Sequence, residues 1–185
     1  MSRFVDVRSI VIQGLSILVI CTFIELGAGF TLKEMEKSFT LIPGLAIMTL
    51  PLLDLRGNIN GALASRLGTA LHAGIITPRL KLTRELKANL AASLILSLMA
   101  SATIGGLSWM VGALMGLQVD ILRLTTVALL AGFISALILA LLTVGISVFT
   151  YIHGWDPDNI TSPAMSTIGD LFTVVCIYLA VLLVG

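Results

Sequence analysis

Hydrophobic residues in this chain gather into long runs that are separated by short polar segments. About 20 predominantly apolar residues are enough for a helix to cross the roughly 30 Å hydrocarbon layer of a bilayer. Five runs reach that length: roughly 9–32, a run starting near 39, about 88–117, a run from the turn at 120–123 to about 151, and about 161–185. The pattern predicts an all-α, polytopic membrane protein with about five transmembrane helices.

Composition agrees with that prediction and also bears on which partners the chain binds. The chain is 57% hydrophobic and 11% charged, with a mean hydropathy of +1.07, which is more apolar than a water-soluble fold needs. We therefore expect one transmembrane domain over residues 1–185, lying in the lipid bilayer, with no cytoplasmic regulatory domain. The net charge is +1, and basic residues stand near the ends of runs, so no nucleic-acid partner is indicated.

The basic residues also predict how the chain is oriented in the cell membrane. Cytoplasmic loops of membrane proteins carry an excess of Lys and Arg. With the amino terminus inside, seven basic residues fall on the cytoplasmic side: Arg3, Arg8, Arg66, Arg79, Lys81, Arg84 and Lys87. Only Lys33, Lys37 and Arg123 fall outside. The pattern predicts a cytoplasmic amino terminus and an external carboxyl terminus.

Two local features concern helix regularity and packing. Proline removes a backbone donor and bends or breaks a helix, so Pro43 and Pro51 predict an irregular second span. In the third span, Gly112 and Gly116 form a GxxxG motif, which lets helix backbones approach closely. We expect a bent second helix and a tightly packed third helix.

Asp170 is the most informative single residue. It lies about nine residues into the fifth run, or roughly 14 Å along a helix and near the bilayer centre. A carboxylate at that depth faces a watery cavity, a partner charge or an ion, or else is protonated and hydrogen-bonded between helices. Ser166 and Thr173 stand one turn before and after it and can add oxygens to the same face, although such hydroxyls also bond their own backbone.

A second polar cluster contains Asp54, Arg56, Asn58 and Asn60. Pro51 and Gly57 can loosen the helix here and free carbonyl oxygens for a hard cation. The alternative is that Asp54 and Arg56 pair with each other or with another helix.

Glu25, in the first run, is expected toward the outer side. It either guards an outer mouth or reaches the membrane interface. The sequence contains no HExxH, GxSxG or P-loop motif, so an enzyme is not predicted.

Several of these segments resemble the membrane domain of MgtE magnesium channels and their eukaryotic solute-carrier relatives. The matching segments, in order, are PLLDLRGN at 51–58, ASRL at 64–67, DPDNITSP at 156–163 and Gly169-Asp170. The resemblance covers essentially the whole chain. It implies that Asp170 binds magnesium in a pore at a dimer interface, with Asn58 as a second contributor and Asp54 as a less certain one.

The resemblance also implies an assembly and an ion. The eukaryotic relatives carry two such halves in one chain, whereas this sequence shows one, so a homodimer is expected. Mg²⁺ prefers oxygen ligands and keeps several waters, so few protein ligands are needed. We expect transport of a divalent cation, with magnesium as the first candidate for the transported ion. No organic cofactor is expected. The alternatives are a proton- or sodium-coupled transporter of another cation, and a membrane scaffold subunit that transports nothing.

Overall fold

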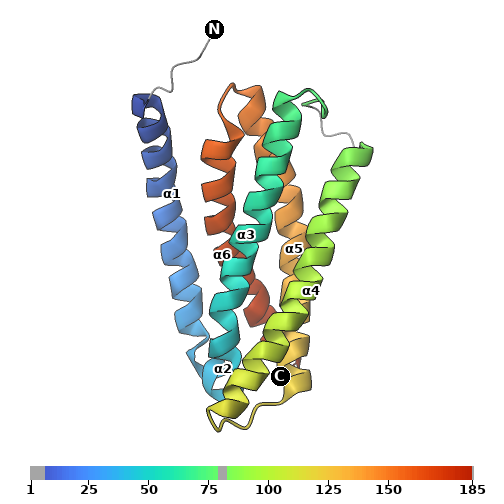
Figure 1. Ribbon diagram of the computed structural model, residues 1–185. Coiled ribbons are helices and arrows are strands. Elements are labelled where there is room, and N and C mark those ends of the chain that lie inside the picture. Colours follow the sequence, from blue (N-terminus) through green and yellow to red (C-terminus); the bar gives the residue numbers. More distant parts are fainter. Residues whose placement is uncertain (1–6, 79–82, 185) are drawn as a thin grey trace.

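The chain folds into long helices that lie side by side. The computed structural model describes residues 7–78 and 83–184, and it contains no strand in those ranges. Its helices are α1 (Val7–Glu34), α2 (Glu36–Leu41), α3 (Leu45–His72), α4 (Arg84–Leu114), α5 (Ile121–Ile152) and α6 (Pro157–Val184). Five are long, and Figure 1 shows them running along a common direction with α1 and α4 at opposite sides of the bundle. The all-helical prediction is confirmed.

Four of the long helices combine the length and the hydropathy of a membrane span. The qualifying segments are Gly14–Glu34, Arg84–Leu114, Ile121–Ile152 and Ile160–Val184. The helix α3 is also long, since 28 residues extend about 42 Å at 1.5 Å per residue. Its composition is too polar for the same criterion, although it lies among the other four. A multi-pass membrane protein is supported, and a fifth span through α3 stays a prediction.

The helix α6 holds the bundle together. It packs against α1, α3 and α5, while α4 packs against α5 and α3. Buried apolar side chains form one cluster among α3, α5 and α6, which includes Leu52, Ala131 and Ile177. A second cluster, with Leu67, Leu86 and Val144, joins α3, α4 and α5.

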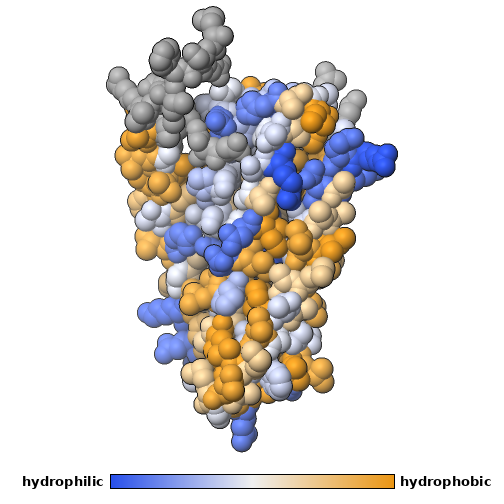
Figure 2. All heavy atoms as spheres, viewed as in Figure 1, coloured by the Kyte–Doolittle hydropathy of each residue, from blue (hydrophilic) through white to orange (hydrophobic). Residues whose placement is uncertain are grey.

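The outer surface is apolar as well. Large hydrophobic side chains are exposed along α1, α4, α5 and α6, and Figure 2 shows hydrophobic atoms over much of the visible face. The helix α1 packs on α6 and leaves most of its surface uncovered. Such a surface is suited to hydrocarbon rather than to water.

The short polar loop around residues 33–37 is more structured than its charge suggests. Lys33 and Glu34 complete α1, and Glu36 begins the short α2. Pro43 lies in the turn after α2, and Gly44, with a φ of 90°, then precedes α3. The second long helix thus begins at Leu45 and not near Phe39.

The expected break in that helix is absent. The helix α3 stays helical through Pro51 and Gly57 to His72. Pro51 is exposed, so its ring points away from the neighbouring helices, and α3 continues past the missing hydrogen bond while it packs against α4, α5 and α6. The prediction of an unwound segment with free carbonyl oxygens is wrong.

The buried face of α4 is made of small residues at intervals of three or four. Apart from Leu86, the buried positions of this helix are Ser93, Ser97, Ser101, Gly105, Ser108 and Gly112. A Cβ built on Gly105 would lie 2.9 Å from the Cα of Thr125 on α5. Small residues at such positions let helix backbones approach closely, so this face fixes how near α4 lies to α5.

The predicted GxxxG motif takes a different role. Gly112 contacts Val119 in the following turn, while Gly116 lies beyond the end of α4 with a φ of 76°. That conformation favours glycine and ends a helix. The next helix begins at Ile121 and is capped by Asp120, whose Oδ1 accepts hydrogen bonds from the backbone N–H of Leu122 and Arg123. The motif therefore ends α4 instead of pairing it with another helix.

The helix order places alternate connections at opposite ends of the bundle. Figure 1 shows the start of α1, the end of α3 and the α5–α6 turn at one end, and the α2–α3 and α4–α5 turns at the other. Arg66, Arg84 and Lys87 lie toward the first end, as the charge count requires. Arg3, Arg79 and Lys81 lie outside the described residues. Which end faces the cytoplasm stays a prediction.

Gly105→Ala should destabilise the protein because its new methyl group meets the backbone of α5. Overpacking of this kind costs about 1–3 kcal/mol. The neighbouring Gly106 has no atom within 4 Å of a built Cβ, so Gly106→Ala is the matched control. We expect the first variant to lower the apparent melting temperature in detergent, and the second to leave it unchanged or raise it. Equal melting temperatures would contradict this account of the α4–α5 contact.

Candidate functional site

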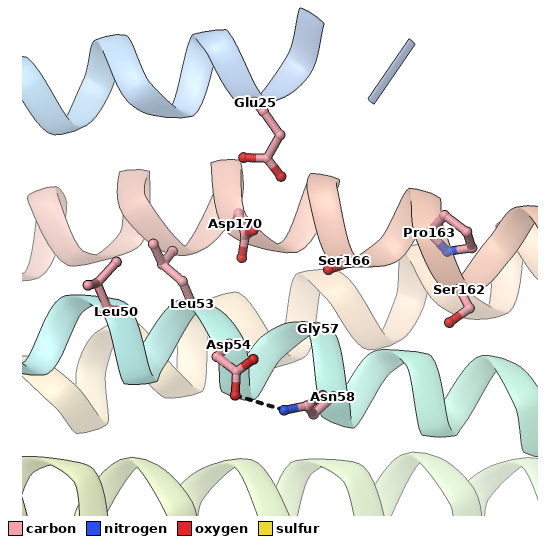
Figure 3. A pocket seen from close by; sticks show the side chains of 10 residues that line it. All are labelled: Glu25, Leu50, Leu53, Asp54, Gly57, Asn58, Ser162, Pro163, Ser166 and Asp170. Carbon is pink, nitrogen blue, oxygen red and sulfur yellow. Dashed lines mark hydrogen bonds between the residues drawn. The ribbon is translucent and has the colours of Figure 1, made fainter. Parts of the chain in front are cut away.

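A polar cavity of about 720 Å³ opens between α1, α3 and α6. Ten residues line it: Glu25, Leu50, Leu53, Asp54, Gly57, Asn58, Ser162, Pro163, Ser166 and Asp170. Figure 3 shows that the first comes from α1, the next five from α3 and the last four from α6. Three of the ten are carboxylic acids, so the cavity gathers negative charge between the three helices.

Asp170 stands at the middle of α6 and faces this cavity. It is partly exposed in the single chain. Figure 3 shows Glu25 reaching from α1 toward it, and both carboxyl groups line the same cavity. The prediction that Asp170 lies at mid-helix beside a polar space agrees with the structure.

The helix α3 supplies the opposite wall. Asp54 and Asn58 are four residues apart and therefore share one face, where the Nδ2 of Asn58 donates a hydrogen bond of 2.9 Å to Asp54 Oδ2. Both side chains are exposed in the single chain. An amide group thus holds the carboxylate on the cavity side of the helix.

Gly57 explains why these two walls are so close. A Cβ at this position would lie 2.8 Å from the Oγ of Ser166 on α6. The glycine lets α3 approach α6 at the level of the cavity, and it does so inside a regular helix. Its role in this structure is close packing and not the loosening of α3.

The two hydroxyl groups expected beside Asp170 lie in different surroundings. Ser166 lines the cavity, whereas Thr173 is fully buried and is not among the lining residues. Its Oγ1 has no hydrogen-bond partner within the described part of the chain. Beyond Asp170, α6 enters the hydrophobic cluster with buried Val174 and Ile177, and this closes the cavity before it reaches Thr173.

Arg56 does not pair with Asp54. Successive helix residues turn by about 100°, so Arg56 points to the opposite side of α3. Its Nη1 donates to Ser97 Oγ at 2.6 Å, and its Nη2 donates to Ser101 Oγ at 2.8 Å. The arginine thus joins α3 to α4, which corrects the expected pair with Asp54 and agrees with a contact to another helix.

Glu25 is the residue whose place the sequence left open. It lines the cavity. The signal in the sequence is that it is the one acidic residue inside the first hydrophobic run. Its depth could be estimated, but only the packing of α1 on α6 decides which way it points.

The chemistry of the cavity is that of hard oxygen donors. Carboxylate, amide and hydroxyl oxygens suit Mg²⁺ and similar cations. Within residues 7–78 and 83–184, no group of three or more His, Cys, Asp or Glu side chains is arranged to hold one metal ion. The cavity volume equals roughly 20 waters at about 30 Å³ each. These dimensions fit a hydrated cation better than a bare one.

Comparison with known proteins agrees with this chemistry. A family model described as MgtE, divalent cation transporter, matches residues 48–180. The chain is 31% identical over 150 residues to solute carrier family 41 member 3 of Rattus norvegicus, which covers 77% of this chain and 30% of that protein. It is 28% identical over 172 residues to solute carrier family 41 member 2 of Homo sapiens, covering 88% of this chain and 30% of that protein.

The chain thus matches less than a third of the length of these relatives. No solved structure matches it significantly. The family model nevertheless covers most of the chain, including the segments of α3 and α6 that line the cavity. This chain therefore belongs to the MgtE family of divalent cation transporters.

Proposed function

We propose that this chain carries a divalent cation across the membrane, with Mg²⁺ as the first candidate, and that the cavity at Asp170 is part of the path. The observation that carries the proposal is a carboxylate at the middle of α6, facing a cavity large enough for a hydrated ion. Ionisable groups inside a membrane span are costly and commonly line ion pathways. Membership of a divalent cation transporter family supports the same conclusion.

In this proposal the cavity residues bind the ion mostly through its water. Asp170 and Asp54 attract the cation from opposite walls, and Asn58 and Ser166 offer neutral oxygens. Mg²⁺ loses its hydration shell reluctantly and needs few direct protein ligands. Glu25 adds a third carboxylate from α1, while Thr173, which does not line the cavity, supports the wall and has no direct contact with the ion.

In this proposal α3 also crosses the membrane, which brings the number of spans to five. The amino terminus lies in the cytoplasm. The polar residues of α3 do not face lipid: Arg56 is buried against α4, and Asp54 and Asn58 line the cavity. A helix with its polar groups shielded in this way can cross a bilayer despite its low hydropathy.

The open side of the cavity supports a homodimer. Asp54 and Asn58 are exposed in the single chain, and Leu50 beside them is 70% exposed. Polar groups left against hydrocarbon would be unfavourable. A second copy of the chain on this face would enclose the cavity and place the carboxylates of both copies along one pore, as a closed twofold assembly does.

Asp170→Asn should abolish or strongly reduce Mg²⁺ flux into liposomes that contain the purified protein. The substitution keeps the size of the side chain and removes its charge, so we expect a decrease of at least about tenfold from the lost attraction to a dication. Asp120→Asn is the matched control, because Asn also caps a helix well and Asp120 lies at the start of α5. Flux should be measured with an encapsulated Mg²⁺ indicator.

The outcomes of that experiment separate the alternatives. Wild-type flux that persists in Asp170→Asn would move the ion path away from the cavity. No flux in the wild type or either variant would contradict transport by this chain alone and favour a scaffold role.

The dimer is tested by cross-linking through Leu50→Cys. The native Cys21 and Cys176 are buried, so a bis-maleimide reagent should react with the new thiol. We expect covalent dimers from Leu50→Cys in the membrane. The control Ile95→Cys is also exposed, but it lies on α4 on the other side of the bundle, and it should give none. Equal cross-linking of both variants would contradict a dimer through the cavity face.

A proton-coupled mechanism is the second candidate, because Glu25 reaches toward Asp170 in the same cavity (Figure 3). Two neighbouring carboxyl groups can share a proton, which an arriving cation would displace. An imposed pH gradient across the liposome should then drive Mg²⁺ flux in the wild type, and Glu25→Gln should remove this dependence. Flux that does not change with the pH gradient would contradict proton coupling and favour an uncoupled pathway.

A further inference from the structure

Arg56 is a positive charge buried at the centre of the bundle. Its side chain is fully buried, and its guanidinium group lies in a slot between α3, α4 and α5. Ser97 and Ser101 accept hydrogen bonds from it, and a Cβ on Gly132 of α5 would lie 3.0 Å from Nη2. The Nε has no partner within the described residues. The slot fits a guanidinium group but supplies only neutral oxygens.

No acidic side chain in the described part of the chain forms an ion pair with this arginine. A buried charge without a counter-charge is unfavourable and is retained mainly where it serves a function. The described acidic residues that lie away from helix ends are Glu25, Asp54 and Asp170. All three line the cavity, so the cavity holds the counter-charges of Arg56.

The arginine stands directly behind the cavity wall. It precedes Gly57, which lines the cavity, and its Cβ lies 3.5 Å from a Cβ built on Gly169, the neighbour of Asp170. Only the thickness of α3, about 10 Å with its side chains, separates the guanidinium group from the cavity. Because no ion pair cancels its field locally, that field extends to the cation position.

In each chain, the formal charges of the three cavity carboxylates and the guanidinium group sum to −2. Without the arginine, the same cavity would carry −3 and would retain a dication more tightly. An ion pathway must bind its ion weakly enough to release it.

We propose that Arg56 is a positioning residue for transport: its fixed positive charge, held by Ser97 and Ser101, weakens cation binding in the cavity and so permits release. This inference rests on the proposed function, since it concerns the ion bound at Asp170. Arg56 acts through its electric field and does not touch the ion.

The test measures the Mg²⁺ concentration at half-maximal flux in liposomes. At about 10 Å and an effective dielectric constant of about 20, one positive charge weakens dication binding by roughly two hundredfold, which water in the cavity reduces. We therefore expect Arg56→Met to lower the half-saturating concentration by at least about tenfold and to lower maximal flux as well. Arg56→Lys keeps the charge and should restore the wild-type half-saturating concentration.

Ser97→Asp cancels the electric field of Arg56 by a second route. It also provides a test if Arg56→Met misfolds. It leaves Arg56 in place and gives it an ion-pair partner, so it should lower the half-saturating concentration in the same way. Ser97→Asn is the neutral control of similar size and should leave that concentration unchanged. A merely structural arginine would lower stability in Arg56→Met without tightening binding, and Ser97→Asp would have no effect on saturation.

The results distinguish this inference from the proposed function. Wild-type flux with unchanged half-saturation in both Arg56→Met and Ser97→Asp overturns the role of Arg56 and leaves transport standing. Absence of wild-type flux overturns both. A lower half-saturating concentration in Ser97→Asp supports the inference even where Arg56→Met does not fold.

Discussion

The cost of placing charge inside a hydrocarbon layer governs this structure. The five long helices bring three carboxylates together at one cavity and bury one guanidinium group between α3, α4 and α5. The helix α3 shows the consequence most clearly, because its hydropathy alone does not identify it as a span. It belongs in the bundle because its polar residues point to a cavity on one side and to the serines of α4 on the other.

Small residues make that arrangement possible. Gly57 lets α3 approach Ser166, Gly105 lets α4 approach Thr125, and Gly132 leaves room for the guanidinium group of Arg56. Membrane helices gain little from hydrophobic attraction to each other, so close van der Waals packing and hydrogen bonds between helices carry more of the stability. The same glycines therefore hold the bundle together and set the positions of the charged groups.

Sequence reasoning placed Asp170 at the middle of a helix because position follows from counting residues along an apolar run, and a lone acid in such a run is conspicuous. It failed at Pro51 and Gly57, where it expected a loosened helix, because packing against neighbouring helices can keep such a segment helical. It left Glu25 undecided, since the direction of that side chain depends on how α1 packs against α6. The serine partners of Arg56 lie more than forty residues away, and no local pattern could identify them.

The size of the cavity bears on how few protein ligands are needed. A site that strips Mg²⁺ of its water must present an octahedron of oxygens at about 2.1 Å, and the described residues contain no such cluster of acidic, His or Cys side chains. A site that admits the hydrated ion needs instead a matching charge and enough space. The cavity provides about 720 Å³ and three carboxylates from each chain. In the proposed pathway, hydration therefore reconciles a sparse set of ligands with a family of divalent cation transporters, because the water shell would supply the coordination while the carboxylates would supply the field.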